Sequence, residues 1–358
     1  MFDGYNIDEE SKLIKRIEND LKLQFEESQK TDVPGELEGK WSSLTSSEPK
    51  RFINPDMTLK VDVLRNFRKL DIFIKDAPGH SRCHGLFNND LFYYIKQISG
   101  GERGISKSMK EIYTFMKENN CLDLLKKYPV SPVGNPNIFK YKGYTYTLRW
   151  IKHIYFLSVF KEILQDKLIS NYTALDIGCS YGIFSSLLKK ECNTSHHILL
   201  DFPEQLVLAH YFLGCTFPQA KIATYKEVSE VESIDREFIE KYDFILLPWF
   251  LYKKLKSNSI DIITNFTSFA EMSRKWFDYY IKSEPFLSTK YFYTNNHIQS
   301  YPTYDTDLTI LDYPLHDFKK LHFRISPFFS HTYIRKYWFF YEKLFFSKSF
   351  EFIGERKS

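Results

Sequence analysis

From residue 146 onward, the apolar positions of the chain alternate between short runs and helical spacing. YTLRWIKHIYFLSVFKEILQDKL (146–168) has the spacing of a long helix and leads into the apolar run TALDIG. Further short runs follow at HILLD (197–201), FILLP (244–248), IDIIT (260–264) and YFYTN (291–295), separated mainly by helical patterns. Strands alternating with helices predict right-handed crossovers and a mostly parallel sheet covered by helices.

Three other segments bear on the predicted sheet. AKIATYKEV (220–228) competes with FILLP for the third strand, and we prefer FILLP because IDIIT is then followed by a helix and a strand, as a fourth strand should be. LHFRISPFF (321–329) and SFEFIGERK (349–357) are predicted to close the sheet as an antiparallel pair. The aromatic stretch between them, 331–346, is predicted to be a helix packed on the core.

The first part of the chain has a different pattern. Residues 8–30 predict a charged helix with apolar positions on one side, and residues 31–50 are rich in Pro, Gly and Ser, which is typical of a linker. The chain changes character after the rigid turn PVSPVGNPN (129–137). We therefore expect a mainly helical N-terminal region over 1–125, acting as a cap on the acceptor side, and an α/β domain over 126–358.

Composition and charge exclude several classes of protein. With 43% hydrophobic and 26% charged residues in 358, the chain can bury a large core and is not disordered throughout. The net charge of +4 is spread along the chain, whereas a nucleic-acid partner usually requires a concentrated basic stripe. Five widely spaced cysteines without a CxxC pair favour free thiols in a reducing compartment. The acidic N-terminus is no signal peptide and the apolar runs are too short to span a membrane, so we expect a cytoplasmic protein, as a monomer or a homo-oligomer.

The strongest chemical signal is LDIGCSYG (175–182), which stands between a buried strand and an amphipathic helix. An α/β sheet binds its ligand at such a turn. The segment lacks the GK[ST] ending of a phosphate-binding loop and the GxGxxG of a dinucleotide-binding turn. Asp176, two residues before Gly178, would repel a pyrophosphate but suits an ammonium group. A ligand with an ammonium group, a ribose and no phosphate is S-adenosylmethionine.

A second carboxylate supports this ligand. Asp201 ends the next predicted strand, from which a carboxylate reaches ribose hydroxyls. Together with Glu204 it also has the spacing of a helix-capping box, with Pro203 in the first turn and Gly214 closing the helix. The capping role and the ribose role can coexist.

With these residues the chain resembles the class I S-adenosylmethionine-dependent methyltransferases. More closely, it is similar to the sugar O-methyltransferases of bacterial surface-polysaccharide gene clusters. The segments that carry the likeness are VGNP (133–136), LDIGCSYG (175–182), LLDFPEQLVLAHYFLG (199–214), FILLP (244–248), IDIITNFTSFAEM (260–272) and the closing FEFIGERK, with NFRK (66–69) as a faint match in the N-terminal region.

The resemblance implies a class I methyltransferase fold, Rossmann-like, and methyl transfer to a sugar hydroxyl of a nucleotide-sugar or surface glycan. It also implies cofactor-binding roles for residues of the predicted strand tips. These are Asp176, Gly178, Cys179, Tyr181 and Gly182 at the amino-acid end, Asp201 at the ribose, Phe202 and Pro248 at the adenine, and Asn265 at the methionine moiety or the acceptor.

A sugar hydroxyl is a poor nucleophile at neutral pH, so a positioned base should take its proton. Glu271 lies just past the fourth predicted strand, although the SFAE segment that begins at Ser268 also has the spacing of a capping box. His297 follows the fifth predicted strand, where the competing interpretation is an exposed loop histidine. Glu271 and His297 are therefore the two candidate catalytic residues.

No metal ligand is assigned. The acidic metal-site pattern of some macrolide-sugar methyltransferases is not visible, which leaves a divalent metal requirement open. His80, Cys83 and His84 lie within one short segment without a distant partner, and this is a poor zinc signature.

Other functions remain in competition with sugar methylation. Another small hydroxylated metabolite would fit the same cofactor turn, and a non-catalytic scaffold could retain the fold. Methylation of nucleic-acid bases is disfavoured because the [DN]PP[YF]-type motif is absent after the fourth predicted strand. The missing GxGxxG also counts against a nicotinamide-dependent reductase.

Overall fold

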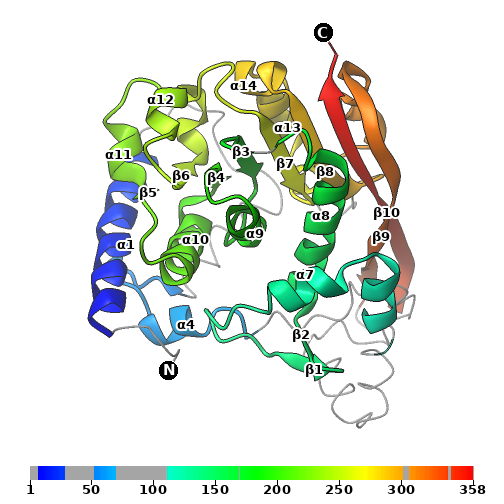
Figure 1. Cartoon of the computed structure of the whole chain (residues 1–358), viewed down its shortest axis with the longest axis horizontal. Helices are drawn as coiled ribbons and strands as arrows, with labels where there is room; N and C mark the ends of the chain where they lie inside the picture. The colour runs from blue at the N-terminus through cyan, green and yellow to red at the C-terminus, as the bar shows by residue number, and fades with distance from the viewer. Residues whose placement is uncertain are drawn as a thin grey trace.

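The fold is known from a computed structural model that describes residues 7–28, 52–69, 110, 112–168, 170–300, 306–337 and 340–357 (Figure 1). Within these ranges one sheet contains the strands β3 (Thr173–Ile177), β4 (His196–Asp201), β5 (Ile222–Ala223), β6 (Phe244–Pro248), β7 (Ile262–Phe266), β8 (Tyr291–His297), β9 (Phe318–Tyr337) and β10 (Phe340–Arg356). Their order across the sheet is β5-β6-β4-β3-β7-β8-β10-β9. A hairpin of β1 (Phe139–Tyr141) and β2 (Tyr144–Tyr146) lies apart from it.

The sheet is parallel from β5 to β8 and antiparallel where β10 joins β8 and β9. The chain moves outward from β3 in both directions, so a ligand crevice is expected above the carboxyl ends of β3 and its neighbours. This confirms the predicted α/β class, a Rossmann-like and mostly parallel sheet. It also confirms FILLP as the strand beside β4, since 220–228 contributes only the two-residue edge strand β5.

Helices cover both faces of the sheet because alternate strand residues point to opposite sides. One apolar core lies under α8 (Leu148–Leu164), α9 (Ile183–Glu191) and α10 (Pro203–Thr216). The other lies under α11 (Tyr225–Ser229), α12 (Arg236–Ile239), α13 (Arg274–Ile281) and α14 (Glu284–Ser288). Short helices are α4 (Val61–Arg65) and α7 (Leu122–Lys127), and the 3-10 turns are η2 (Trp249–Lys254), η3 (Phe269–Glu271), η5 (Ile310–Asp312) and η6 (Leu315–Asp317).

The prediction of a helix over 331–346 is wrong. Strand β9 continues to Tyr337, β10 begins at Phe340, and the two pair antiparallel through this stretch, for example at Phe345 and Thr332. Aromatic and β-branched side chains favour a pleated strand, and each of the two segments provides the partner that the other needs.

Two predicted caps of α10 are also wrong. The N-cap is Phe202, without a side-chain cap, so the box between Asp201 and Glu204 does not form, although Pro203 does occupy the first turn. Gly214 lies inside α10, whose C-cap is Phe217. A Cβ at Gly214 would stand 2.8 Å from Leu13, so this glycine allows a neighbouring helix to approach.

That neighbouring helix is α1 (Ile7–Ser28), which confirms the helix predicted over 8–30. Glu10 accepts hydrogen bonds from Tyr211 of α10 (2.7 Å) and from Arg65. Arg16 donates to the backbone oxygen of Ile222 in β5 (2.8 Å). The described part of the N-terminal region therefore packs on the α/β domain, while the predicted division at 125/126 remains a prediction.

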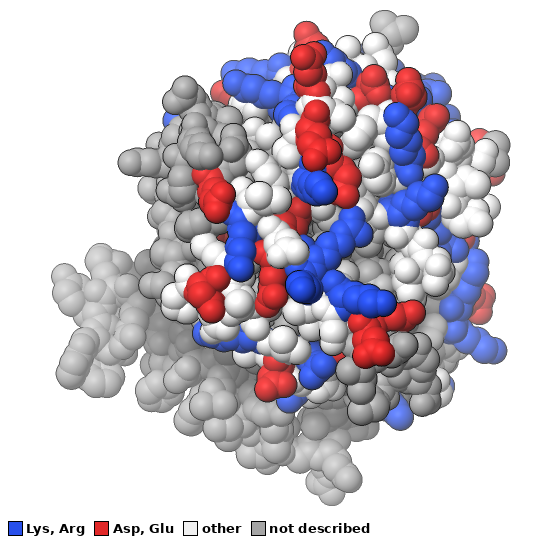
Figure 2. All heavy atoms as spheres, turned by 90° about the vertical axis from the view of Figure 1, so that its left-hand side faces the viewer, with Lys and Arg blue, Asp and Glu red and all other residues white. Residues whose placement is uncertain are grey.

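The surface around α1 carries both charge signs. In the view with α1 toward the reader, Lys and Arg side chains are interspersed with Asp and Glu, and no continuous basic stripe appears on this face (Figure 2). No helix in the described ranges has the length and apolarity needed to cross a membrane. Cys121, Cys179, Cys192 and Cys215 are free thiols.

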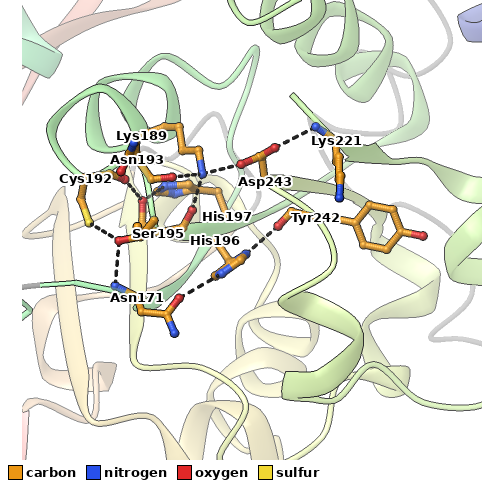
Figure 3. A network of polar contacts seen from close by, with 11 residues as sticks. Asn171, Lys189, Cys192, Asn193, Ser195, His196, His197, Lys221, Tyr242 and Asp243 are labelled. Carbon is orange, nitrogen blue, oxygen red and sulfur yellow. Dashed lines mark hydrogen bonds and ion pairs between the residues drawn. The ribbon is translucent and has the colours of Figure 1, made fainter. Parts of the chain in front are cut away.

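A polar network holds the amino ends of β4 and β6, at the edge of the sheet opposite the glycine-rich turn (Figure 3). Lys189 of α9 donates to the backbone oxygen of Ser195 (2.8 Å) and forms an ion pair with Asp243 (2.6 Å). The ring of His197 bonds to the Ser195 hydroxyl (2.7 Å), and burial lowers the pKa of His197 well below its ordinary value. The network ties α9 to the start of two core strands.

Replacing Lys189 with Met should lower the free energy of unfolding by about 1–3 kcal/mol, because Asp243 and the bonded backbone oxygens would lose a buried cation. The Lys189 side chain is 8% exposed and that of Asp243 is 31% exposed. Urea unfolding measures the change. Lys241→Met is the matched control, since Lys241 pairs with Glu237 on the open surface and should cost less than about 0.5 kcal/mol. Equal effects of the two substitutions would contradict the prediction.

Candidate functional site

The turn after β3 depends on two glycines. Gly178 has a φ of 73° and Gly182 a φ of 80°, a left-handed conformation that glycine adopts without strain. A Cβ at Gly178 would collide with the hydroxyl of Ser268, and one at Gly182 would stand 2.7 Å from Leu199. The turn therefore folds tightly against the tips of β4 and β7, as the D-x-G-x-x-x-G spacing predicted.

Asp201 connects the tip of β4 directly to this turn. One carboxylate oxygen accepts the backbone N–H of Ser180 and the other accepts that of Phe202, both at 2.8 Å. Because β3 and β4 are adjacent and parallel, Asp176 and Asp201 stand at neighbouring strand tips. This confirms the predicted position of the two carboxylates. The role of each carboxylate in binding a ligand remains a prediction.

The electrostatics of the two carboxyl groups are unusual. Burial raises the pKa of Asp176 to about 7, although the Thr264 hydroxyl, which donates to it at 2.8 Å, acts in the opposite direction. Part of Asp201 reaches the surface, yet burial raises its pKa to about 7 as well, with Asp176 and Glu204 adding to the effect and the two backbone donors opposing it. A cationic ligand placed at these carboxyls would restore their charged form.

Glu204, in the first turn of α10, adds a third carboxyl beside Asp201. Burial raises its pKa, and its Oε2 is buried without a hydrogen-bond partner in the part of the chain that the structure describes. A buried acceptor without a donor destabilises the ligand-free protein. The region around Asp201 therefore has unused capacity to accept a hydrogen bond.

Tyr181, which was predicted to line the cofactor, packs against other parts of the protein instead. Tyr181 is 3% exposed, its hydroxyl accepts a hydrogen bond from Arg68 (3.1 Å), and its ring packs edge-on against Phe67 and Phe212. Cys179 is buried as well, and burial raises the pKa of its thiol. The contacts with Arg68, Phe67 and Phe212 assign the Tyr181 side chain to holding the turn in place, whereas the role of Cys179 at the cofactor remains a prediction. Gly178 and Ser180 are the partly exposed residues of the turn.

The side chain of Asn265 in β7 likewise makes its hydrogen bonds within the protein. Its amide nitrogen donates to the backbone oxygen of Ile177 (2.8 Å) and to Ser268 (2.6 Å). Its oxygen accepts from the backbone N–H of Phe269 and from the Asn296 amide. These four bonds use the full donor and acceptor capacity of the side chain. Asn265 therefore braces the tips of β3 and β7, and it offers no spare bond to the methionine moiety that it was predicted to face.

The two candidate bases differ in their surroundings. Glu271 ends η3 and is partly exposed at the carboxyl edge of the sheet. The predicted capping box at this position does not form, because Ser268 makes no side-chain cap and donates instead to the backbone oxygen of Ile177 (3.0 Å). His297 is the last residue of β8, is 2% exposed, and its ring lies 3.3 Å from the Ser349 hydroxyl. The alternative of an exposed loop histidine is therefore wrong.

Sequence reasoning missed an aromatic cluster beside Asp201. Pro248, predicted to border the adenine, pairs in register with Asp201 and is followed by Trp249, whose ring centroid lies 5.0 Å from that of Trp276 on α13. Trp276 is 7% exposed, and its Nε1 is buried without a partner within the described residues. Trp276 in turn contacts Tyr280, whose pKa is raised by burial and also by Asp201. The signal in the sequence was the aromatic pair directly after FILLP.

No metal site is visible among the residues that the structure describes. Within the described ranges, His, Cys, Asp and Glu side chains do not gather in any group of three that could hold a metal ion. His80, Cys83 and His84 lie outside these ranges.

No family model and no curated protein matches the chain. Several solved structures are similar to it. TehB from Haemophilus influenzae gives a TM-score of 0.36 at 14% identity over 60% of this chain and 69% of its own. Magnesium protoporphyrin IX methyltransferase from Synechocystis PCC 6803, solved with bound SAM, gives 0.34 at 13% over 59% and 86%. An O-methyltransferase family 2 protein from Planctomyces limnophilus, in complex with apigenin, gives 0.33 at 12% over 53% and 51%. Likenesses this low bear on neither ligand nor acceptor, and the fold class rests on the strand order of the chain itself.

Proposed function

We propose that this protein is an S-adenosylmethionine-dependent methyltransferase that methylates a hydroxyl oxygen, with a sugar as the acceptor. The observation that carries the proposal is the pair of carboxyls at the tips of β3 and β4. Asp176 stands directly before the glycine-rich turn, Asp201 is hydrogen-bonded to it, and burial raises the pKa of each to about 7. A ligand with an ammonium group and a ribose would supply a cation and two hydroxyl donors where the ligand-free protein lacks them.

The surrounding residues suit the remaining parts of this ligand. Gly178 and Ser180 leave the backbone of the turn accessible at the amino-acid end. Asp201 keeps lone pairs for ribose hydroxyls beyond the two backbone bonds that it accepts. Phe202, Trp249 and Trp276 provide apolar and aromatic surface for an adenine. The Nε1 of Trp276, which has no hydrogen-bond partner among the described residues, can donate to a ring nitrogen.

When bound, S-adenosylmethionine supplies a methyl group on a sulfonium sulfur that leaves readily. The protein therefore has mainly to align the acceptor oxygen with the methyl carbon, which can contribute on the order of 7–11 kcal/mol. Glu271 is partly exposed at the same edge, and we assign it the role of the base that takes the hydroxyl proton. His297 is the weaker candidate because it is buried against β10.

The sugar acceptor rests on the resemblance through residues 260–272. Incubation with methyl-labelled cofactor and a panel of sugars, sugar phosphates, nucleotide-sugars and non-sugar hydroxyl compounds tests it. Label in a sugar supports the proposal, and label only in a non-sugar acceptor would replace it with small-molecule methylation. A protein that binds no S-adenosylhomocysteine by calorimetry would instead be a scaffold that keeps the fold.

The affinity for S-adenosylhomocysteine should depend on pH. The bound ligand favours the ionised carboxyls, so its affinity is lost as the pH falls through their pKa of about 7. We expect the affinity to fall by about tenfold or more between pH 7.5 and 5.5. At still higher pH the affinity should fall again, because the ligand's α-amino group then loses its charge. Calorimetry in buffers of different ionisation enthalpy should show proton release on binding at pH 6. A constant affinity across this range would exclude both carboxyls from the ligand.

A further inference from the structure

Directly after β7, the backbone of Thr267 adopts a left-handed conformation. Its φ is 74°, and side chains that branch at Cβ are strained at a positive φ. In the described part of the chain, Thr267 is the one β-branched residue among the non-glycine positions with a positive φ. Strained residues of this kind persist only where the surrounding structure holds them, and they are concentrated at functional sites. Thr267 is therefore a candidate for a role beyond the fold.

A network of buried polar groups holds the chain on both sides of Thr267. Its own backbone N–H donates to the backbone oxygen of Asn295 (2.8 Å), which continues the pairing of β7 with β8 beyond the end of β7. Two positions earlier, Asn265 accepts a hydrogen bond from the buried amide of Asn296 (2.8 Å). One position later, Ser268 donates to the backbone of β3 (3.0 Å). Because each of these groups has its partner, the network is rigid enough to keep the residue in its strained conformation.

The strained residue belongs to the candidate site. A Cβ at Gly178 would collide with the hydroxyl of Ser268, so the residue that follows Thr267 lies directly against the glycine-rich turn. Four positions after Thr267, Glu271 ends η3, and we have assigned it the role of the base. The side chains of Thr267 and Glu271 are both partly exposed. Thr267 therefore stands at the carboxyl edge of the sheet, where an acceptor has to approach the cofactor.

The hydroxyl of Thr267 differs from the other hydroxyls of this region in its bonding. Thr264 donates to Asp176 (2.8 Å), and Ser300 donates to the backbone oxygen of Ala270 (2.8 Å). The Thr267 hydroxyl makes no hydrogen bond with any residue that the structure describes. Glycine would adopt the same backbone conformation without strain, so the fold gains nothing from this side chain. A local rule that is broken beside a site is expected where the side chain serves a ligand.

We propose that Thr267 binds the acceptor through a hydroxyl adjacent to the one that is methylated. This inference rests on the proposed function and narrows its acceptors to vicinal diols, against compounds with an isolated hydroxyl. The reacting oxygen uses one lone pair for the new bond to the methyl carbon and gives its proton to the base, while the electron pair of the broken carbon–sulfur bond stays on sulfur. A further donor on that oxygen would lower its nucleophilicity, so the neighbouring hydroxyl is the better partner. A threonine hydroxyl both donates and accepts, which matches a neutral hydroxyl.

Two substitutions separate the strain from the hydroxyl. Thr267→Gly relieves the strain and should raise the melting temperature of the ligand-free protein by about 2–4 °C. Thr267→Val keeps the branched shape and removes only a hydroxyl without a partner in the described structure, so the melting temperature should stay within about 1 °C. Asn258→Gly is the matched control, because Asn258 is an exposed residue with a φ of 59° before the amino end of β7, and Asn tolerates this conformation better. An unchanged or lower melting temperature of Thr267→Gly would show that Thr267 is not strained and would overturn the inference.

The binding test uses the full chain with S-adenosylhomocysteine and two probes, cis-1,2-cyclohexanediol and cyclohexanol, whose weak binding is measured by ligand-observed NMR. In Thr267→Val, the ratio of the two affinities should shift against the diol by about five- to tenfold. The affinity for S-adenosylhomocysteine should remain within twofold of the wild type. Asn258→Gly should leave both the ratio and this affinity unchanged. A wild type that does not bind the diol, or a ratio that Thr267→Val leaves unchanged, overturns the inference.

The outcomes separate this inference from the proposed function. A protein that binds no S-adenosylhomocysteine refutes the methyltransferase, and titration of the ligand-free protein with the two probes then still decides the role of Thr267. In transfer assays with a methylated diol, Thr267→Val should raise KM more than it lowers kcat. Removal of the neighbouring hydroxyl from that acceptor should make the wild type and the variant equal, which a purely structural role of Thr267 would not do. An isolated hydroxyl that the wild type methylates as efficiently as the diol would contradict the proposal.

Discussion

Replacing Asp201 with Asn should weaken the binding of S-adenosylhomocysteine by roughly 100-fold. The carboxylate accepts N–H groups from Ser180 and Phe202 and still has lone pairs for ribose hydroxyls. An amide has one oxygen, and its NH2 group would face one of the two backbone donors. Ribose binding and the geometry of the turn are therefore lost together. Calorimetry at pH 8, where the wild-type carboxyl is ionised, measures the change.

The ligand-free stability of the same variant distinguishes lost binding from lost folding. A carboxyl whose folded pKa is raised to about 7 stabilises the ligand-free protein at low pH, and this contribution is lost as the pH rises through 7. Asn does not titrate, so the variant should show a weaker loss of stability between pH 5 and 8 than the wild type. Asp278→Asn is the control, since Asp278 pairs with Lys282 on the surface of α13. An affinity within twofold of the wild type would exclude Asp201 from the cofactor site.

Replacing Arg68 with Met should lower the free energy of unfolding by about 3–5 kcal/mol. The Arg68 side chain is completely buried, and its guanidinium donates to the backbone oxygens of Ser131 (2.8 Å) and Val133 (2.9 Å) as well as to the Tyr181 hydroxyl. Its charge also lies 5.3 Å from the Tyr181 ring centroid and 5.6 Å from that of Phe212. Met would leave three buried acceptors without this donor. Urea unfolding measures the loss.

The same substitution should also weaken S-adenosylhomocysteine binding by about tenfold, because Tyr181 would lose the contact that fixes the glycine-rich turn from behind. Tyr181→Phe removes only the hydroxyl and should lower the free energy of unfolding by about 1 kcal/mol. The double variant that carries both substitutions should differ from the sum of the two single effects, because the two side chains share one hydrogen bond. Arg236→Met is the control, since Arg236 forms a partly exposed pair with Asp261 on the other face of the sheet. If Arg68→Met were no more damaging than Arg236→Met, Arg68 would not anchor the turn.

The sequence identified those features whose physics is local. An apolar run that ends at an acid and two spaced glycines defines a strand, a tight turn and a helix without reference to the rest of the chain. In this way Asp176, Gly178 and Gly182 were correctly placed. Asp201 was placed by the same logic, as the last residue of the next apolar run. The alternation of such units was enough to predict a mostly parallel sheet.

The orientation of individual side chains was beyond the sequence. Tyr181 turns toward Arg68 and Asn265 toward Ser268, because buried polar groups must find partners, and these partners come from distant parts of the chain. Neither contact produces a periodic pattern in the sequence. The same reason explains the burial of His297, which depends on β10 pairing with β8. A residue at a strand tip can thus bind the ligand or make hydrogen bonds within the protein, and this depends on the residues that fold against it.

The sequence by itself therefore determined the order of strands and helices, the glycine-rich turn and the two acids at neighbouring strand tips. Only the tertiary structure decided that 331–337 and 340–346 continue two long strands and that Arg68 supports the turn. The physical reason is the range of the interactions. Backbone conformation follows from residues a few positions apart, whereas burial, pairing and shifted pKa values arise between segments that only folding brings together.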